Sequence, residues 1–134
     1  MDKQLLCDKA IEAMRYAYAP YSSYRVGAAL LTKSGKVYTG CNIENASYGA
    51  TNCAERTALF KAVSEGETEF EALAIAGGKE GNIEGAFPPC GICRQVLSEF
   101  CDNNFKVLLV TCATDFAEYT LEQLLPLSFD QKYL

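Results

Sequence analysis

Two almost entirely apolar segments, Phe70–Ala76 and Phe105–Thr111, constrain the fold more than any other feature of this sequence. Strands with so little polar surface are expected in a sheet that is covered on both faces. Helical patterns separate these strands along the chain, and strands joined through helices pair in parallel within layered α/β folds. A chain of 134 residues, 49% of them hydrophobic, is long enough for one such domain, which we expect to span residues 1–134.

The remaining segments alternate between helix and strand patterns. In the first half we expect a helix from the N-cap Asp2 to Pro20, a hairpin of strands 26–32 and 36–42 about a turn at Gly35, a loop over 43–52 and a helix over 53–64. In the second half we expect the strand 70–76, a glycine-rich loop over 77–89, a helix ending near Cys101 and the strand 105–111. A short strand near Glu118 and a helical turn over 121–125 follow. This order predicts a three-layer α/β/α sandwich built on a mixed five-stranded sheet.

The composition excludes several classes of function. The chain has no His, so Ser-His-Asp catalysis, Cys-His catalysis and His-bearing zinc sites are excluded. A formal net charge of −5, with scattered basic residues, argues against a nucleic-acid polymer as partner. Neither a signal-peptide pattern nor an apolar run of membrane-spanning length is found, so we expect a cytoplasmic protein with no membrane partner. In a reducing compartment, the seven Cys residues are expected to be metal ligands, reactive thiols or buried apolar side chains rather than disulfides.

Three of the cysteines are spaced for a metal site. Cys53-Ala54-Glu55 opens one expected helix, and Pro89-Cys90-Gly91-Ile92-Cys93 opens the next. A Cys-x-x-Cys pair places two thiols within reach of one ion, and helix N-termini stabilise thiolates. Three thiolates on one Zn²⁺ leave a tetrahedral position open for water, which is the layout of a catalytic site. Glu55, two residues from a ligand, is placed to carry protons at that position.

Three other interpretations of these residues remain open. Cys-x-x-Cys at a helix start is also typical of a redox dithiol, although that leaves Cys53 and Glu55 without a purpose. The zinc could instead be structural, with Cys41 or Cys112 as a fourth ligand. Asn52 and Glu55 also match a variant of the capping box, with Asn52 as the N-cap and Glu55 at N3.

A charge count points to Arg56. Zn²⁺ with three thiolates carries a net charge of −1, which weakens the pull of the ion on bound water. Arg56 lies three residues after Cys53 on the same expected helix. We hypothesise that Arg56 donates to a zinc-bound sulfur and restores the acidity of the metal; the alternative is an ordinary surface Arg.

These motifs resemble those of the zinc-dependent cytidine deaminases, and of their small, homotetrameric branch. The resemblance covers nearly the whole chain, and its motifs are Ala19-Pro20-Tyr21-Ser22, Val26-Gly27-Ala28-Ala29-Leu30, Gly40-Cys41-Asn42-Ile43-Glu44-Asn45-Ala46-Ser47-Tyr48, Cys53-Ala54-Glu55-Arg56, Pro89-Cys90-Gly91-Ile92-Cys93-Arg94-Gln95 and Leu124-Leu125-Pro126. The cysteine motifs alone specify only the zinc nucleobase deaminases in general. The segment from Asn42 to Tyr48 narrows the resemblance to enzymes that act on nucleosides.

The resemblance implies hydrolytic deamination of cytidine and 2′-deoxycytidine in pyrimidine salvage. Cys53, Cys90 and Cys93 would hold the zinc. Glu55 would move protons from the attacking water to N3 of the ring and then to the departing ammonia. The backbone N–H groups of Ala54 and Cys90 would bind the pyrimidine O2 and the attacking oxygen.

Further residues are implied to bind the substrate. Asn42 and Glu44 match the pair that binds the ribose 3′-hydroxyl, and a polar loop closing on itself is the alternative. Tyr24 stands where many relatives have Phe, which adds a hydroxyl beside the base pocket. Phe129 matches an aromatic side chain that one subunit extends over the pyrimidine held by another, and Tyr48 belongs to the same pocket. The resemblance thus implies a homotetramer with shared active sites; the alternative for Phe129 is packing on its own subunit.

Two further positions depart from the family pattern without touching a proposed ligand. Pro88 replaces a more usual Ser, and Ile92 replaces a smaller residue. The nearest rival enzyme is a drug-inactivating deaminase of the blasticidin type, which is not expected to carry Asn42-Ile43-Glu44-Asn45. A polynucleotide deaminase is disfavoured by the negative charge. A structural zinc module is the rival from another class, and it predicts a fourth protein ligand and no effect of Glu55→Ala.

Overall fold

Helix α1 begins where the sequence predicts and ends earlier. The computed structural model describes residues 1–134, and α1 spans Lys3–Ala13. The side chain of its N-cap, Asp2, accepts a hydrogen bond of 3.0 Å from the N–H of Leu5. A 3-10 turn, η1 (Met14–Tyr16), follows directly, so the predicted continuation to Pro20 is wrong.

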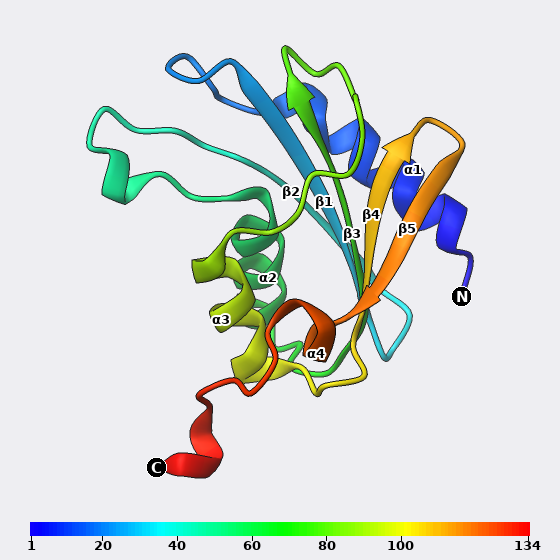
Figure 1. The fold of residues 1–134 in the computed structure, drawn as a ribbon, viewed down its shortest axis with the longest axis vertical. Coiled ribbons are helices and arrows are strands. Elements are labelled where there is room, and N and C mark those ends of the chain that lie inside the picture. The colour runs from blue at the N-terminus through cyan, green and yellow to red at the C-terminus, as the bar shows by residue number, and fades with distance from the viewer.

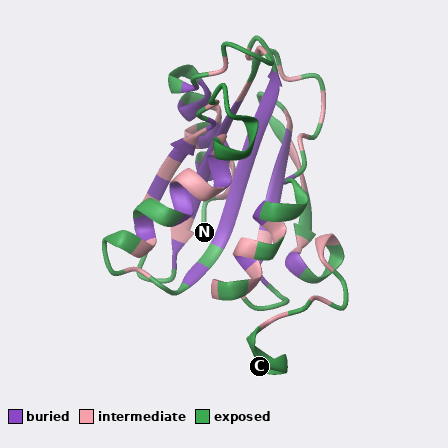
Figure 2. Ribbon diagram, turned by 90° about the vertical axis from the view of Figure 1, so that its left-hand side faces the viewer, coloured by how far each residue is buried: buried purple, intermediate pink, exposed green.

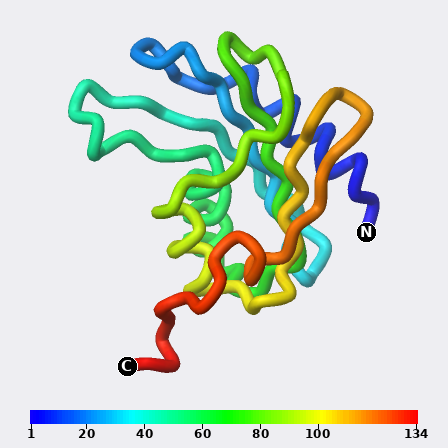
Figure 3. The backbone as a smooth tube through the Cα atoms, in the orientation of Figure 1, coloured from blue at the N-terminus to red at the C-terminus, as the bar shows by residue number.

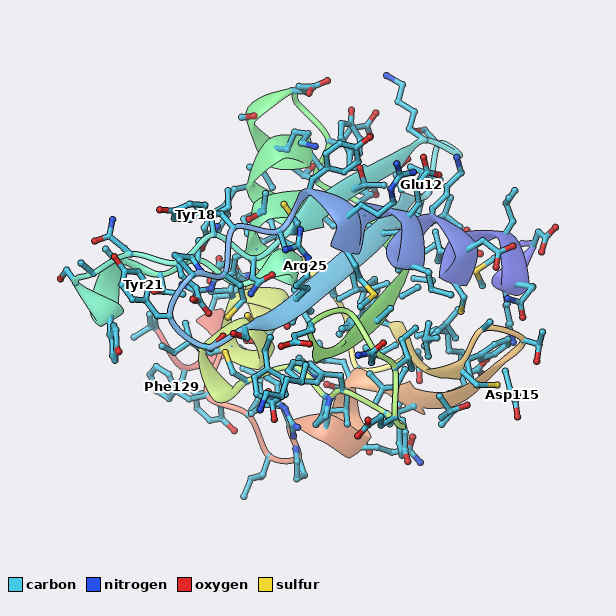
Figure 4. The ribbon with its side chains drawn as sticks, turned by 90° about the horizontal axis from the view of Figure 1, so that it is seen from above. Glu12, Tyr18, Tyr21, Arg25, Asp115 and Phe129 are labelled. Atoms are coloured by element: carbon cyan, nitrogen blue, oxygen red, sulfur yellow. The ribbon has the colours of Figure 1, made fainter.

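Tertiary contacts end this helix before Pro20. The Arg25 guanidinium donates to the carbonyls of Met14 (3.3 Å) and Arg15 (2.9 Å), which satisfies acceptors at the helix end. The N–H of Tyr18 then donates to the carbonyl of Asn42 at 2.9 Å instead of to a preceding turn. Figure 4 shows Arg25 close to the end of α1.

The sheet has five strands in the spatial order β2-β1-β3-β4-β5 (Figure 1). The strands are β1 (Tyr24–Thr32), β2 (Val37–Cys41), β3 (Phe70–Lys79), β4 (Lys106–Cys112) and β5 (Asp115–Thr120). β3 and β4 pair in parallel, and the other three neighbouring pairs are antiparallel. The sheet is therefore mixed and five-stranded, as the sequence predicts.

Helices cover both faces of this sheet. Helix α1 packs on one face, while α2 (Ala54–Ser64) and α3 (Gly91–Phe100) lie on the other, beside the short α4 (Leu121–Leu124). Each face has its own hydrophobic cluster, and the buried residues concentrate in the central strands between the helices (Figure 2). The predicted three-layer α/β/α sandwich is confirmed. No helix is both long and apolar enough to cross a membrane.

The two crossover connections differ. Helix α3 joins β3 to its parallel neighbour β4, as expected of a strand–helix–strand unit. Helix α2 joins β2 to β3, but β1 lies between those two strands, so they do not pair.

The end of β3 lies beyond the predicted limit of Ala76. Gly77, Gly78 and Lys79 continue the ladder with β1, where Gly77 pairs with Val26 and Lys79 with Tyr24. The chain then turns and runs back toward the start of α3 (Figure 3). This longer strand brings the β3–α3 loop close to the N-terminal end of β1.

Candidate functional site

Two helix starts bring three thiols together. Cys53 is the N-cap of α2, Cys90 is the N-cap of α3, and Cys93 lies in the first turn of α3. The Cys90 sulfur lies 3.7 Å from that of Cys53 and 3.5 Å from that of Cys93. All three sulfurs lie within 4.8 Å of one another. The first N–H groups of both helices therefore lie beside the thiols and favour their ionised form.

The cluster fits a zinc ion with one position left open. Tetrahedral zinc–thiolate bonds of about 2.3 Å place sulfurs about 3.8 Å apart, close to the separations found here. Cys41 and Cys112 are not part of the cluster, so neither closes it as a fourth ligand. The structural zinc site with four cysteines is thus not formed. Cys53 and Cys90 also line a cavity, so an ion held by the three sulfurs would be next to space that a small molecule can enter.

Hydrogen bonding within the cluster favours a thiolate at Cys53. A hydrogen bond from Cys93, helped by those from Arg56 and Cys90 and opposed by burial, lowers the pKa of Cys53 to about 5. The same bond raises the pKa of Cys93, which is 1% exposed. Arg56 places Nη2 3.4 Å from the Cys53 sulfur and 3.5 Å from the carbonyl of Thr51. These two contacts hold the guanidinium against the cluster, while its Nε is buried without a partner.

Glu55 is the only buried carboxylate, with 4% of its surface exposed. Burial raises its pKa to about 7, in the range suited to a group that takes up and releases protons near neutral pH. The capping-box interpretation is wrong, because the N-cap is Cys53 and the amide of Asn52 donates to the hydroxyl of Thr57 at 3.0 Å. Glu55 instead lines the same cavity as Cys53.

This cavity has a volume of about 210 Å³ and contains most of the predicted substrate-binding residues. Its walls come from Ser22, Tyr24, Val26, Asn42, Glu44, Thr51, Cys53, Ala54, Glu55, Phe87, Pro88 and Cys90. Ala54 is the first residue of α2, so its N–H has no acceptor within the helix and can bind a ligand atom. Asn42 and Glu44 supply polar side chains to the cavity, while Tyr24, Val26 and Phe87 supply apolar ones.

Hydrogen bonds to the backbone hold the side chains of Asn42 and Glu44 in the cavity wall. The Asn42 amide, 8% exposed, accepts from the N–H of Val26 at 2.9 Å and donates to the carbonyl of Tyr24 at 2.8 Å. The Glu44 carboxylate accepts from the N–H groups of Tyr21 (2.9 Å) and Ser22 (3.1 Å) and from the Ser22 hydroxyl. Although desolvation raises it, these hydrogen bonds lower the pKa of Glu44, so the group stays ionised.

Tyr48 and Phe129 lie outside this cavity. Tyr48 is 75% exposed and lines an adjoining cavity of about 290 Å³ together with Tyr21 and Glu44. Phe129 is 62% exposed, stacks on Tyr133 at 5.6 Å, and is carried by a tail that projects from the body of the molecule (Figures 1 and 3). Seen from above, Phe129 and Tyr21 lie on the side opposite Asp115 (Figure 4).

The sequence predictions missed Phe87, Ser22 and Thr51 in the cavity wall. Ser22 belongs to a motif that carried the resemblance, and a hydroxyl before the strand was its only signal. Phe87 had none, because the loop that positions it has no regular pattern. The largest cavity, about 600 Å³, lies elsewhere between α1 and the β3–α3 loop, and it contains none of the cysteines.

Comparison with known proteins gives one consistent family. The family model for the cytidine and deoxycytidylate deaminase zinc-binding region matches residues 1–109. A cytidine deaminase of Halalkalibacterium halodurans is 52% identical over 129 residues, covering 96% of this chain and 95% of that protein. A cytidine deaminase of Sporosarcina psychrophila is 48% identical over 134 residues, covering 100% and 96%.

The fold is also shared with solved structures. A crystal structure of cytidine deaminase from Burkholderia pseudomallei superposes with a TM-score of 0.88 at 46% identity, covering 96% of this chain and 100% of that one. Sequence, fold and the three-thiol cluster agree, and this chain belongs to the zinc-binding cytidine and deoxycytidylate deaminase family.

Proposed function

We propose that this chain hydrolyses cytidine and 2′-deoxycytidine to uridine and 2′-deoxyuridine with release of ammonia, as a step of pyrimidine salvage. The observation that carries the proposal is the position of Glu55. A buried carboxylate lies in one cavity with a cysteine cluster that leaves a metal position open. The same cavity is also lined by the polar side chains of Asn42 and Glu44, which can bind the hydroxyl groups of a sugar joined to the base.

Cys53, Cys90 and Cys93 would hold the ion, and the bound zinc would supply Lewis-acid activation of a water molecule. Glu55 takes the proton that this water loses as its oxygen bonds to C4, and it delivers that proton to N3 of the ring. Glu55 then takes the remaining proton of the former water from the hydroxyl on C4 and passes it to the exocyclic amino group, so that the bond from C4 to this nitrogen breaks, ammonia leaves and the C4 carbonyl of uridine forms. Water and cytidine give uridine and ammonia, so atoms and charge balance.

The remaining cavity residues bind and orient the nucleoside. The N–H of Ala54 donates to the pyrimidine O2, which places N3 next to Glu55. Asn42 and Glu44 bind the 3′-hydroxyl, which both ribose and 2′-deoxyribose carry. Their own hydrogen bonds to Tyr24, Val26 and Ser22 fix them before substrate arrives, so little ordering is needed on binding. The presence of Asn42 and Glu44 in the cavity disfavours the blasticidin-type alternative, for which this pair is not expected.

The test is a direct one. Zinc-loaded wild-type protein and Glu55→Gln are mixed with cytidine, and the ultraviolet absorbance of cytosine is followed as uracil forms. We expect turnover by the wild type and a loss of at least about 10³-fold in Glu55→Gln. Zinc content and thermal unfolding of both proteins serve as controls, since Gln keeps the shape of Glu. An inactive wild type that is folded and zinc-loaded would refute the proposed reaction.

We further propose a homotetramer in which neighbouring subunits complete each site. The cavity of one chain, about 210 Å³, is smaller than the roughly 300–1,000 Å³ of most small-molecule sites. Large exposed hydrophobic side chains occur on α2, on α3 and on the tail, among them Phe60, Ile92 and Phe129. Phe129 cannot stack on a base in its own cavity from the position that it occupies, so we assign it, with Tyr48, to a neighbour's site.

Mixing two inactive variants tests the shared site. Glu55→Gln removes the proton carrier of a site, and Phe129→Ala removes the aromatic side chain donated to another. After exchange of subunits, some sites in the mixture contain an intact Glu55 and an intact Phe129. We expect activity to return on mixing and the protein to sediment as a tetramer. A monodisperse monomer with full activity would contradict this proposal.

The role of Arg56 and the compartment complete the proposal. Arg56 donates to the Cys53 sulfur and reduces the negative charge that three thiolates place around the ion. The chain has seven free cysteines, and its ligand thiols must stay reduced to bind zinc. We therefore place the protein in the cytoplasm, where thiols are kept reduced.

A further inference from the structure

Phe87 forms a wall of the cavity, and no step of the proposed reaction uses it. It lies on the β3–α3 loop and lines the cavity together with Tyr24 from β1. The two rings lie 6.1 Å apart with an interplanar angle of 34°. The two rings therefore form a neighbouring aromatic pair in the cavity wall.

Two consecutive glycines make this position possible. A Cβ atom at Gly77 would lie 2.8 Å from Cγ and 2.9 Å from Cδ1 of Phe87, so the ring rests on bare backbone of β3. A Cβ atom at Gly78 would lie 1.8 Å from the carbonyl oxygen of Asn82, so any side chain there would prevent the loop from folding back. Gly77 and Gly78 therefore place the ring beside the cavity.

The loop is also fixed by backbone hydrogen bonds. The N–H of Glu80 donates to the carbonyl of Ser23 at 2.6 Å, which ties the loop to the start of β1. The N–H of Asn82 donates to the carbonyl of Lys79 at 2.9 Å, which closes the turn after β3. These bonds fix the start of the loop, and the contact with Gly77 seats the Phe87 ring against the sheet.

The proposed function sets which edge of the base meets this wall. C4 must lie at the cysteine cluster, and its ring neighbour N3 must face Glu55. The other ring neighbour of C4 is C5, which therefore points away from Glu55. Glu55 is carried by α2, whereas Phe87 and Pro88 belong to the other segment that reaches the cluster, the β3–α3 loop that leads to Cys90, and both line the same cavity. We therefore assign the C5 side of the base to this loop.

We propose that Phe87 is a specificity-determining residue: its ring, seated on Gly77 and beside Tyr24, meets position 5 of the cytosine and limits the size of a substituent there. This inference rests on the proposed function, because it needs a cytidine in the cavity. The ligand class that it concerns is cytidine with a methyl group or a halogen at position 5. Gly77 acts through Phe87 and is a positioning residue.

Substrate discrimination tests the wall. Turnover of cytidine, 5-methylcytidine and 5-iodocytidine is measured for the wild type, Phe87→Leu and Phe87→Ala. One methylene group in an apolar pocket changes discrimination by about 10- to 200-fold. We therefore expect kcat/KM for 5-iodocytidine relative to cytidine to rise about tenfold or more in Phe87→Ala, and less in Phe87→Leu. The electronic effect of iodine cancels, because every variant meets the same two substrates.

Two controls separate the wall from general loosening of the fold. Phe116→Ala truncates another partly buried Phe, one that packs on the opposite face of the sheet, and it should keep the wild-type ratio. Binding of uridine and 5-iodouridine, measured by competition against cytidine, should show the same change of preference in the Phe87 variants. This second measurement does not depend on the rate of the chemical step.

Gly77 provides an independent test of the positioning. Gly77→Ala should displace the Phe87 ring and raise KM for cytidine more than it lowers kcat. In Gly77→Ala/Phe87→Ala the two ring contacts are gone and only the Cβ of residue 87 remains, at 3.2 Å, so KM should return close to that of Phe87→Ala alone. If Gly77 were needed only for the geometry of β3, the KM of the double variant for cytidine would instead be higher than that of either single variant.

Each outcome decides between the two proposals. Unchanged substrate ratios in both Phe87→Leu and Phe87→Ala, with folded proteins, would overturn the assignment of Phe87. If Phe87→Ala does not fold, the substrate ratio of Phe87→Leu and the KM of Gly77→Ala test the assignment of Phe87 in its place. If the folded, zinc-loaded wild type does not turn over cytidine itself, the proposed function is refuted. The first measurement in the series, turnover of cytidine by the wild type, shows this.

Discussion

Gly40 on β2 has no side chain, and this lets helix α2 pack directly on the sheet. A Cβ atom at Gly40 would lie 2.5 Å from the backbone nitrogen of Ala58 and 2.6 Å from the carbonyl oxygen of Ala54. Both contacts are with helix backbone, which cannot rotate away as a flexible side chain can. Gly40→Ala should therefore push α2 off the sheet.

The size of the displacement follows from these distances. Ordinary contact begins at 3.4 Å, so the gap from 2.5 Å to 3.4 Å requires a movement of about 0.9 Å. The first turn of α2 carries Cys53 and Glu55, whereas Cys90 and Cys93 belong to α3 and stay behind. Metal–ligand distances tolerate only about 0.2 Å, and a misplacement of about 1 Å costs about 10²-fold in rate. Overpacking adds a loss of about 1–3 kcal/mol in the free energy of unfolding.

Three measurements check this prediction. We expect Gly40→Ala to lose about 10²-fold in kcat/KM for cytidine, to release zinc faster to a chromogenic chelator, and to unfold at a lower temperature. Gly27→Ala is the matched control, because a Cβ atom there would lie 2.0 Å from the carbonyl oxygen of Ala10 on α1, on the other face. It should lose stability but keep its zinc and most of its activity at temperatures where it is folded. A folded Gly40→Ala with wild-type turnover and wild-type zinc release would refute the reasoning.

Three further predictions concern the same site. Arg56→Ala should lower kcat by about 10- to 100-fold while zinc stays bound, as measured by turnover and by metal analysis, because a hydrogen bond to a charged sulfur is lost. A strong chelator should abolish turnover and lower the unfolding temperature, and added Zn²⁺ should restore both. Ser22→Ala should raise KM for cytidine, because Glu44 loses its hydroxyl donor. Desolvation raises the pKa of Glu44, but hydrogen bonds lower it overall. The ionised Glu44 therefore contributes its full stabilisation above the ordinary pKa of 4.5 and loses it as pH falls through the lowered value. Because Ser22→Ala removes one of these hydrogen bonds, its stability should fall less steeply with acid.

Local patterns were sufficient for most of the fold. Each helix and strand appears in the predicted order because its apolar periodicity matches the face that it buries. The cluster of three thiols was predictable for a similar reason, since Cys53 and Cys90 mark helix starts and Cys93 is fixed by its spacing. Glu55 follows from the same helix, because its distance from Cys53 is set by the chain.

Tertiary effects account for the parts that the sequence left undetermined. The end of α1 depends on Arg25, which lies ten residues beyond the helix-end carbonyl that it binds most closely. Asn42 was predicted as a ligand for the sugar, yet its amide also holds the strand backbone at Val26, which no local pattern reveals. Phe87 depends on two glycines that a helix or strand pattern treats only as interruptions.

The charges around the cysteine cluster explain why Arg56 should matter more for the reaction than for holding the metal. Zn²⁺ with three thiolates carries a net charge of −1. The N-termini of α2 and α3 both meet the cluster, and each contributes roughly +0.5 of an elementary charge. These two helix ends alone neutralise the cluster, so the ion stays bound when the guanidinium is removed. Arg56 then supplies the excess positive charge on the Cys53 side, where the cavity begins, and this excess is what a developing negative charge on the substrate would meet.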